Sequence, residues 1–249
     1  IEEMTLPFVG DDRSYYTSSS NKYMDTFGYI FGYEKSSSST GKWLYQYFYD
    51  YYYFYNIPTS IRKVTITDAI NIPSNAFYNC DFIEEIQINN VKEIHQYAFY
   101  NCSSLVRLNS DKDGEFNIPQ TVTSISSYAF YNCEKAEEIT LSNNVTSILK
   151  GAFSGCQNIT KFNSDNENEM VVPSKCEEIG DEAFKGLKLI KTVIVPNTVK
   201  SIGKGAFSGC DSIEEMTLPF VGDDRSYYTY NSDKYMDTFG YIFGYEKSL

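Results

Sequence analysis

Cysteine is the residue type with the most obvious chemistry in this chain of 249 residues, which contains six. In an exported protein six cysteines could form a disulfide framework, because oxidising compartments favour bridges. One repeated position, however, holds Cys five times and Leu187 once, and Cys176 stands where other repeats carry Val. A position that accepts Leu is an apolar core position, so we expect buried free thiols. Zinc is disfavoured because no Cys-x-x-Cys pair occurs.

Histidine, the most common general base, occurs once, as His95. It follows the apolar Ile94, and no motif places a serine or a carboxylate against it. A histidine-rich metal site is impossible with one histidine, and a catalytic triad is improbable. We therefore expect a surface histidine, no catalytic residue and no cofactor.

Two similar acidic inserts, 109–116 and 163–170, are the remaining candidates for a metal site. Asp111 to Glu115 resembles the start of a calcium loop, in which alternate oxygens surround the ion. Its glycine comes two residues too early, and the second insert has no glycine. We therefore predict solvated loops that protrude from one edge of the fold, with weak calcium binding as the alternative and no dedicated metal site.

Internal repeats must position all of these residues. Residues 1–36 recur at 213–248 with three differences, so the period is 212 residues. We interpret the chain as a fragment of a longer protein that begins partway through one period. In this division, 1–9 is a partial repeat strand, 10–56 a Tyr-rich insertion, 57–212 six shorter repeats and 213–249 the start of a second copy.

The shorter repeats are marked by Ala-Phe pairs at 76–77, 98–99, 129–130, 152–153, 183–184 and 206–207. Two residues after each Phe comes Asn or Gly, which tolerate a left-handed backbone and are typical of helix C-caps. Alternating apolar residues follow, as in a strand with one buried face. Units of about 22 residues cannot bury a core alone, so they must stack into a solenoid. The expected core is Phe77, Cys80, Phe99, Cys102, Phe130, Cys133, Phe153, Cys156, Phe184, Phe207 and Cys210.

The repeats read apolar-x-x-Ile-x-Ile-Pro-x-x-Val-x-x-Ile-x-x-x-Ala-Phe-x-Asn/Gly-Cys, and over residues 57–218 they resemble the BspA-type leucine-rich repeat of surface proteins. Leu187 in the Cys position and Ala69 in the first Val position depart from that pattern. The resemblance implies an α/β solenoid with a parallel sheet on its concave face and short helices and turns on its convex face. It also implies a non-enzymatic protein, located at the cell surface or secreted, that attaches to host or neighbouring cells.

The exposed side of the predicted sheet carries two rows of polar residues. In the first row, from Lys63 to Lys161, basic and acidic residues alternate strand by strand, which predicts a ladder of opposite charges on neighbouring strands. The second row is a hydrogen-bonding strip interrupted by Ile194, and it is a candidate contact surface for a ligand. Its candidate residues are Thr65, Gln87, Asn109, Thr140 and Asn163, with Thr5 and Thr217 at the two ends.

A second candidate contact surface is the run 45–55, which has nine aromatic residues in eleven. Tyrosine offers a large rigid contact area with a hydroxyl group that can stay hydrated, so Tyr49, Tyr51, Tyr53 and the neighbouring Trp43 are candidate ligand contacts. The alternative is a segment that packs one row of rings inward and binds nothing.

Composition narrows the class of partner. A net charge of −12 argues against nucleic acid, and no run of about 18 apolar residues predicts membrane insertion. The partner that we expect is a protein or glycan on another cell surface. A structural spacer without a ligand is the alternative, and a polysaccharide-active enzyme lacks the clustered carboxylates that it would need. Apolar ends at 1–9 and 213–220 also predict end-to-end self-association unless the Tyr-rich segments cap them.

Overall fold

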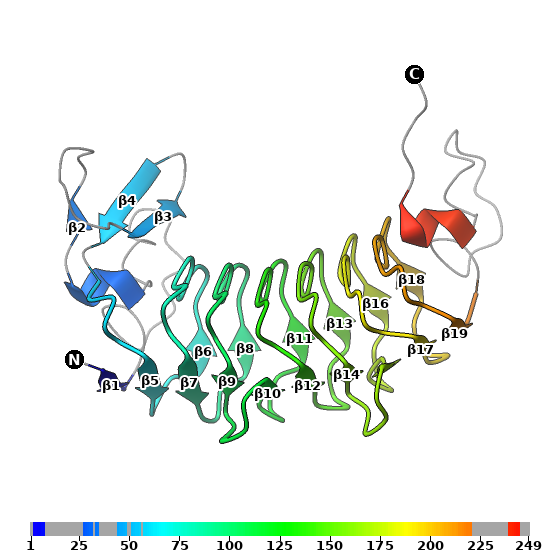
Figure 1. Ribbon diagram of the computed structural model, residues 1–249, viewed down its shortest axis with the longest axis horizontal. Coiled ribbons are helices and arrows are strands. Elements are labelled where there is room, and N and C mark those ends of the chain that lie inside the picture. Colours follow the sequence, from blue (N-terminus) through cyan, green and yellow to red (C-terminus); the bar gives the residue numbers. More distant parts are fainter. Residues whose placement is uncertain are drawn as a thin grey trace.

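The structure, a computed structural model, describes residues 2–7, 27–31, 33–34, 44–48, 51–55, 57–220 and 239–244. Its central part is a row of stacked coils, in which two parallel sheets lie on opposite sides of one core (Figure 1). This arrangement confirms the predicted leucine-rich-repeat solenoid.

The larger sheet has ten strands in the order β1-β5-β7-β9-β10-β12-β14-β15-β17-β19, and all neighbours are parallel. In each full coil an apolar residue of the strand points inward, and Val64, Ile86 and Val193 are fully buried. The strands are β1 (Glu3–Leu6), β5 (Lys63–Ile66), β7 (Glu85–Ile88), β9 (Arg107–Leu108), β10 (Glu115–Asn117), β12 (Glu138–Thr140), β14 (Lys161–Phe162), β15 (Glu169–Val171), β17 (Thr192–Ile194) and β19 (Glu215–Thr217).

The opposite side of the solenoid carries a sheet of six two-residue strands instead of the predicted short helices. These strands are β6 (Asn71–Ile72), β8 (Glu93–Ile94), β11 (Ser124–Ile125), β13 (Ser147–Ile148), β16 (Glu178–Ile179) and β18 (Ser201–Ile202). The Ala-Phe segments between the sheets are turns. A helix does not form there because the backbone amides bond to the next coil: Phe77 N donates to Ala98 O at 2.7 Å, and Phe99 N donates to Ala129 O at 2.8 Å.

The two acidic inserts are loops only in part: their tips, at 111–113 and 165–167, are exposed, but the rest of each insert belongs to the sheet. Each insert ends in a strand of the larger sheet, β10 or β15. The reason is a single apolar residue in each, Phe116 and Met170, whose side chains are fully buried in the core. Burying such a side chain contributes about 1.5–3 kcal/mol, which holds the end of the insert against the solenoid.

The core is a set of columns that run along the solenoid. The Phe residues of the Ala-Phe pairs lie one above another, with ring centroids 5.1 to 6.1 Å apart from Phe77 to Phe207. All six cysteines are buried and free. Four thiols donate to the carbonyl of the Phe in the preceding coil, for example Cys102 Sγ to Phe77 O at 3.1 Å.

Further elements lie at both ends of the solenoid (Figure 1). The first end has the 3-10 helix η2 (Phe27–Phe31) and an antiparallel sheet in the order β2-β4-β3, made of β2 (Tyr33–Glu34), β3 (Leu44–Phe48) and β4 (Tyr51–Tyr55). The other end has the 3-10 helix η3 (Phe239–Phe243), which repeats the sequence of η2.

Candidate functional site

The charged row on the larger sheet is engaged in ion pairs within the protein. Glu85 lies between Lys63 and Arg107, with N–O distances of 2.7 and 3.1 Å, and Arg107 also pairs with Asp113 of the first insert. Burial by itself would raise the pKa of Glu85, but hydrogen bonds from Lys63, Gln87 and Arg107 outweigh it and lower the pKa. Glu85 is therefore an ionised member of a closed network.

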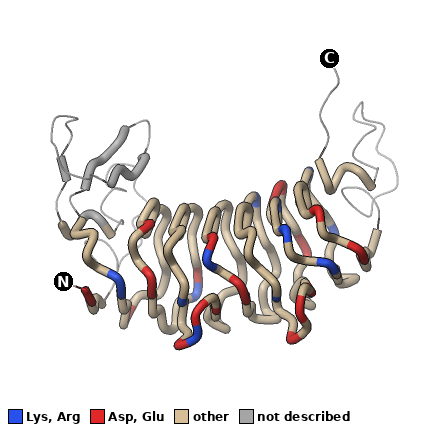
Figure 2. Tube along the Cα trace, in the orientation of Figure 1, with Lys and Arg blue, Asp and Glu red and all other residues tan. Residues whose placement is uncertain are grey.

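A second network lies further along the same face. Glu138 accepts from Lys112 at 2.6 Å and from Lys161 at 3.3 Å, and Lys161 reaches Glu167 of the second insert at 2.9 Å. The hydrogen bond from Lys112 is the largest cause that lowers the pKa of Glu138. Charges of both signs interleave along the solenoid (Figure 2).

The predicted strand-by-strand alternation of charge is wrong at the first insert. Arg107 and Glu138 are not on neighbouring strands, because Glu115 of β10 lies between them. Glu169 of β15 likewise separates Lys161 from Thr192. Glu115 accepts from Ser110, and Glu169 accepts from Ser164 and Asn166, so each extra carboxylate is held within its own insert.

The predicted hydrogen-bonding strip is brought together only in part. Thr65 and Gln87 are register partners, and Thr140 is exposed beside Asn117. Asn109 accepts from Ile88 N at 2.6 Å and donates to Asn117 O at 2.9 Å. Asn163 accepts from Leu141 N at 3.3 Å. These two amides hold neighbouring strands, and binding by the strip stays a prediction.

The remaining predicted contact residues are the aromatic ones of the Tyr-rich insertion. Trp43 and Tyr49 are outside the described residues. Tyr51 and Tyr53 belong to β4, which pairs with β2 and β3, and the directions of their side chains are outside the described part of the chain.

His95 is half-buried, and its Nε2 lies 3.2 Å from Glu93 Oε2. Burial lowers its pKa and the Glu93 carboxylate raises it, with burial the larger cause. Within the described ranges, no group of three or more His, Cys, Asp or Glu side chains could hold a metal ion. No described helix is long and apolar enough to cross a membrane.

The most distinctive surface is an edge of the solenoid, between the two sheets, that carries two columns of stacked tyrosines. In the first column Tyr100 stacks between Tyr78 and Tyr131, with centroid distances of 4.7 and 4.6 Å. In the second, Tyr97 and Tyr128 stack at 5.2 Å. The columns touch edge to face, and all five rings are half-buried. We call these five residues the aromatic edge.

The backbone that positions the aromatic edge is strained. Tyr97 and Tyr128 have φ angles of 59° and 56°, in the left-handed region that bulky residues rarely adopt. Such a conformation costs on the order of 1–3 kcal/mol per residue and is typical of functional sites. The equivalent residues of the other repeats also have positive φ, 61° at Asn75, 60° at Gly151, 53° at Glu182 and 63° at Gly205, and only glycine meets this requirement without strain.

Asparagine side chains bind these coils together. Asn101 donates to Asn79 Oδ1 at 2.9 Å, and Asn132 donates to Asn101 Oδ1 at 3.0 Å. In every repeat, the second residue after the Ala-Phe pair has a positive φ, as predicted. These six residues are Asn79, Asn101, Asn132, Gly155, Gly186 and Gly209. The amide ladder therefore fixes the spacing of the three coils that carry the tyrosines.

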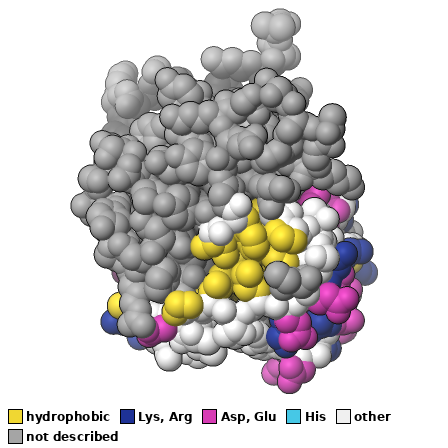
Figure 3. Space-filling model, turned by 90° about the vertical axis from the view of Figure 1, so that its left-hand side faces the viewer, with side chains coloured by type: hydrophobic (Ala, Val, Ile, Leu, Met, Phe, Trp, Pro, Cys, Tyr) yellow, Lys and Arg dark blue, Asp and Glu magenta, His cyan; other side chains and the backbone are white. Residues whose placement is uncertain are grey.

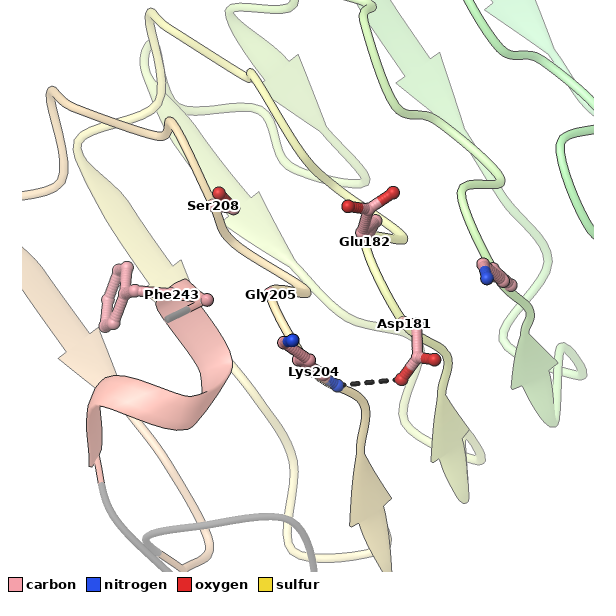
Figure 4. A pocket seen from close by; sticks show the side chains of 8 residues that line it. Asp181, Glu182, Lys204, Gly205, Ser208 and Phe243 are labelled. Atoms are coloured by element: carbon pink, nitrogen blue, oxygen red, sulfur yellow. Dashed lines mark hydrogen bonds between the residues drawn. The ribbon is translucent and has the colours of Figure 1, made fainter. Parts of the chain in front are cut away.

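A shallow polar hollow continues the same edge toward η3 (Figure 4). Its lining includes Gly205, Ser208 and Phe243, with the charged residues Lys150, Asp181, Glu182 and Lys204 around it. Lys204 N donates to Asp181 Oδ1 at 2.8 Å. The hollow lies where the tyrosine columns have ended, because the later repeats carry Gly or Ser at most of these positions.

The sequence reasoning missed the aromatic edge, although a signal was present. Ala-Phe-Tyr-Asn-Cys occurs at 76–80, 98–102 and 129–133, and Tyr precedes the Ala-Phe pair at 97 and 128. The denser tyrosine run at 45–55 is the stronger signal in the sequence. Three tyrosines at one repeat position lie in one column of a solenoid, so the repeat alignment could have predicted their stacking.

Comparisons with known proteins agree with this fold. The chain matches the BspA type leucine-rich repeat region, in six copies, over residues 48–115, 110–169 and 161–239. No curated protein sequence matches it. A leucine-rich repeat protein from Bacteroides ovatus is 25% identical with a TM-score of 0.53, over 74% of this chain and 48% of that one. The leucine-rich repeat protein of T. pallidum is 24% identical with a TM-score of 0.49, over 62% of this chain and 68% of that one.

The chain thus spans about half the length of the Bacteroides ovatus protein. The family match covers well over half of the chain, and the stacked coils, the buried Phe column and the parallel sheets agree with it. The chain belongs to the BspA type leucine-rich repeat family.

Proposed function

We propose that this chain is a non-enzymatic binding module of a cell-surface protein, and that the aromatic edge is its contact surface. Leucine-rich repeats of the BspA type are a general protein-binding fold and are typically surface-associated. The single observation that carries the proposal is the pair of stacked tyrosine columns, two of whose members occupy a strained backbone.

The tyrosines at these two positions are informative because the solenoid does not need an aromatic side chain there. Later repeats carry Gly151, Glu182 and Gly205 in place of Tyr97 and Tyr128 and keep the same backbone conformation. Large aromatic side chains at those positions therefore contribute something other than the fold. A rigid row of half-exposed phenol rings offers apolar contact area, and its hydroxyl groups supply directed hydrogen bonds.

The partner that we propose is a protein or glycan on another cell surface. Both classes present a mixture of apolar patches and hydroxyl or amide groups, which phenol rings can contact. The sheet face is less suited to this role, because Glu85, Arg107, Glu138 and Lys161 already pair with one another or with the inserts.

A binding screen with the whole chain tests the proposal. The chain would be presented to arrays of immobilised glycans and extracellular-matrix proteins, with Tyr100→Ala as the matched variant. We expect at least one ligand whose affinity falls about tenfold or more in the variant, as for a central aromatic contact. If every ligand found binds both proteins equally, the aromatic edge is not the contact surface.

A spacer without a ligand of its own is the second candidate, and one observation favours it. Residues 213–248 copy residues 1–36 with three differences, and the copied strand β19 extends the larger sheet. Adding such periods would lengthen a stalk without changing its contacts. Under this alternative, Tyr100→Ala would leave cell attachment of the parent protein unchanged.

A further inference from the structure

A second hollow lies beside the aromatic edge, where the strands β13, β16 and β18 of the six-stranded sheet end. Its volume is about 390 Å³, within the range of small-molecule sites, roughly 300–1,000 Å³. Its lining comes from the third to the sixth repeats. We call it the corner hollow, and its lining includes the polar residues Ser127, Lys150, Glu178, Asp181 and Ser201.

Two glycines keep the corner hollow free of side chains. Gly180 and Gly203 stand where earlier repeats carry a larger residue, such as Leu149. A Cβ on Gly180 would collide with the backbone of Lys150, and one on Gly203 would collide with the backbone of Asp181. Because backbone atoms of a packed coil cannot move aside, the close stacking of the coils requires glycine at both places.

The polar side chains around the corner hollow are largely available to a ligand. Lys150, Glu178 and Asp181 are exposed, and Ser127 is half-buried. Among the described residues, the side chains of Lys150, Glu178 and Ser127 have no hydrogen bond or ion pair. Asp181 uses only Oδ1, which accepts from Lys204 N at 2.8 Å (Figure 4). Donors and acceptors of both charges are therefore open to solvent at one place.

The charges of the larger sheet differ in this respect. Glu85 lies within 2.7 Å of Lys63 Nζ and 3.1 Å of Arg107, so its carboxylate is already engaged. In the end view, Lys and Arg side chains lie among Asp and Glu side chains on the right (Figure 3). The larger sheet thus uses within the protein the kinds of group that the corner hollow leaves open.

The corner hollow is continuous with the aromatic edge. Ser127 directly precedes Tyr128, whose ring lies against Gly151, since a Cβ on that glycine would collide with two ring carbons. Lys150 directly precedes Gly151. Burial raises the pKa of Tyr97, and the charge of nearby Lys150 opposes that rise. A ligand that crosses the tyrosine columns therefore reaches the corner hollow.

The chemistry of the lining favours a sugar over a protein side chain. The buried cores of protein interfaces are depleted in charged residues, whereas charged residues surround this hollow. A sugar hydroxyl both donates and accepts, so it can donate to Glu178 or Asp181 and accept from Lys150. Two carboxylates against one ammonium leave an excess of negative charge, which disfavours carboxylated or sulfated sugars.

We propose that the corner hollow binds one uncharged sugar unit of a glycan whose neighbouring units lie along the aromatic edge. The choice of a glycan over a protein rests on the proposed function, in which the aromatic edge is the contact surface. Glu178 and Asp181 would accept hydrogen bonds from the sugar hydroxyls, and Lys150 and Ser127 would donate to them. Tyr128 would contact the adjoining unit.

Affinities of the whole chain for neutral and acidic oligosaccharides, measured by titration calorimetry after an array screen, test the proposal. Asp181→Asn keeps an oxygen that can accept from Lys204 N but replaces the other carboxylate oxygen by a donor. We expect Asp181→Asn and Lys150→Ala each to weaken binding of a neutral glycan about tenfold, as for the loss of a charged hydrogen bond. Lys188→Ala, at an exposed lysine outside the lining, is the matched control and should change the affinity less than about twofold.

The outcomes separate this proposal from the proposed function. If a neutral glycan loses affinity in Tyr100→Ala but not in Asp181→Asn or Lys150→Ala, the corner hollow is not a sugar site, although the aromatic edge remains the contact surface. The choice of an uncharged glycan is overturned if only protein ligands depend on Tyr100, if no neutral glycan binds, or if acidic glycans bind more tightly. If no ligand depends on Tyr100, the proposed function fails as well.

Thermal unfolding of each variant shows whether it has kept its fold. Should Asp181→Asn or Lys150→Ala fail to fold, Glu178→Gln takes its place, because it changes an exposed carboxylate that has no partner among the described residues. Glu178→Gln should also weaken binding of the neutral glycan, and an unchanged affinity would overturn the proposal.

Discussion

The first three repeats and the last three share one backbone path at the edge of the solenoid but carry different side chains there. Tyr78, Tyr100 and Tyr131 follow the Ala-Phe pairs of the first three, whereas Ser154, Lys185 and Ser208 follow the last three. Asn79, Asn101 and Asn132 become Gly155, Gly186 and Gly209. All six of these Asn and Gly residues keep positive φ, from 54° to 81°.

The comparison separates what the fold requires from what it permits. A left-handed residue is required in every coil, and glycine supplies it with the least strain. The amide ladder and the tyrosine columns are additions that only the first half carries. This difference is the reason for placing the binding surface on the first half.

A rise in pH should have the largest effect. Burial raises the pKa of Cys156 to about 12 and those of Cys176 and Cys210 to about 11, from an ordinary value near 9. Burial also raises the pKa values of Cys80, Cys102 and Cys133. Above pH 9 the thiols ionise in the unfolded chain while they stay protonated in the fold. The stabilisation is therefore complete below pH 9 and is lost as the pH rises toward the folded-state values, by about 1.4 kcal/mol per thiol and pH unit.

Denaturant unfolding at pH 7 and pH 10 measures this loss. Four of the five cysteines in the repeated position lie in the first four repeats, and Leu187 takes the place of Cys in the fifth. Cys102→Ala removes one buried thiol. It should therefore reduce the loss in the free energy of unfolding between pH 7 and pH 10 by the contribution of that thiol. A midpoint that is the same at both pH values would contradict the assignment of buried, protonated thiols.

Gly155→Ala should cost the most among the substitutions, about 3 kcal/mol from left-handed strain and a lost hydrogen bond. Gly155 has a φ of 81°, and a Cβ there would collide with the amide oxygen of Asn132, which would have to move. The matched control is Gly186→Ala, with a φ of 80° and its nearest neighbouring atom at 4.0 Å. Strain alone should cost about 1–2 kcal/mol there. Equal losses in the denaturation midpoint would show that the neighbouring Asn132 adds nothing to the cost of a side chain at Gly155.

Tyr100→Ala should destabilise the first half by about 2 kcal/mol, because it removes the ring that stacks on both neighbours in its column. Tyr100→Phe retains the ring and should change the free energy of unfolding by less than about 0.5 kcal/mol. Thermal unfolding of the two variants checks this pair. Equal stability of both variants would mean that the stacking contributes little.

Asn101→Gly should have the smallest effect, about 1 kcal/mol, because it removes hydrogen bonds of the amide ladder but keeps a residue suited to positive φ. Asn90→Gly is the control, at an exposed position with a φ of 58°, and should change stability by about 0.5 kcal/mol or less. Chemical denaturation resolves such differences only as paired measurements. The ladder would have no stabilising role if the two losses were equal.

Much of the fold could be predicted from the sequence, because a repeat multiplies weak signals. Positions such as those of Phe77 and Val64 recur in the same phase in six units, so periodicity alone identifies the core and the parallel sheet. The prediction of short helices was wrong because the backbone hydrogen bonds at these positions join neighbouring coils. Phe99 N bonds to Ala129 O rather than within its own segment, and a local reading of capping residues cannot detect a bond to another coil.

The candidate site was harder to predict for a similar reason. Phe116 and Met170 appeared to belong to polar loops, yet each adds a strand to the larger sheet, and the strand of Phe116 divides the predicted ladder between Arg107 and Glu138. The aromatic edge depends on stacking between residues 22 to 31 positions apart, such as Tyr78 and Tyr100. A column alignment can predict that proximity, but the strained φ of Tyr97, which points to function, is seen only in three dimensions.

A paired binding measurement compares the aromatic edge with the larger sheet as the contact surface. For any ligand found on the glycan and matrix-protein arrays, the affinities of Tyr128→Ala, in the aromatic edge, and of Thr140→Ala, on the larger sheet, would be compared with that of the unchanged chain. We expect Tyr128→Ala to weaken binding about tenfold or more and Thr140→Ala to leave it within about twofold. The reverse result, with Thr140 required and Tyr128 dispensable, would show that the larger sheet, and not the aromatic edge, is the binding surface.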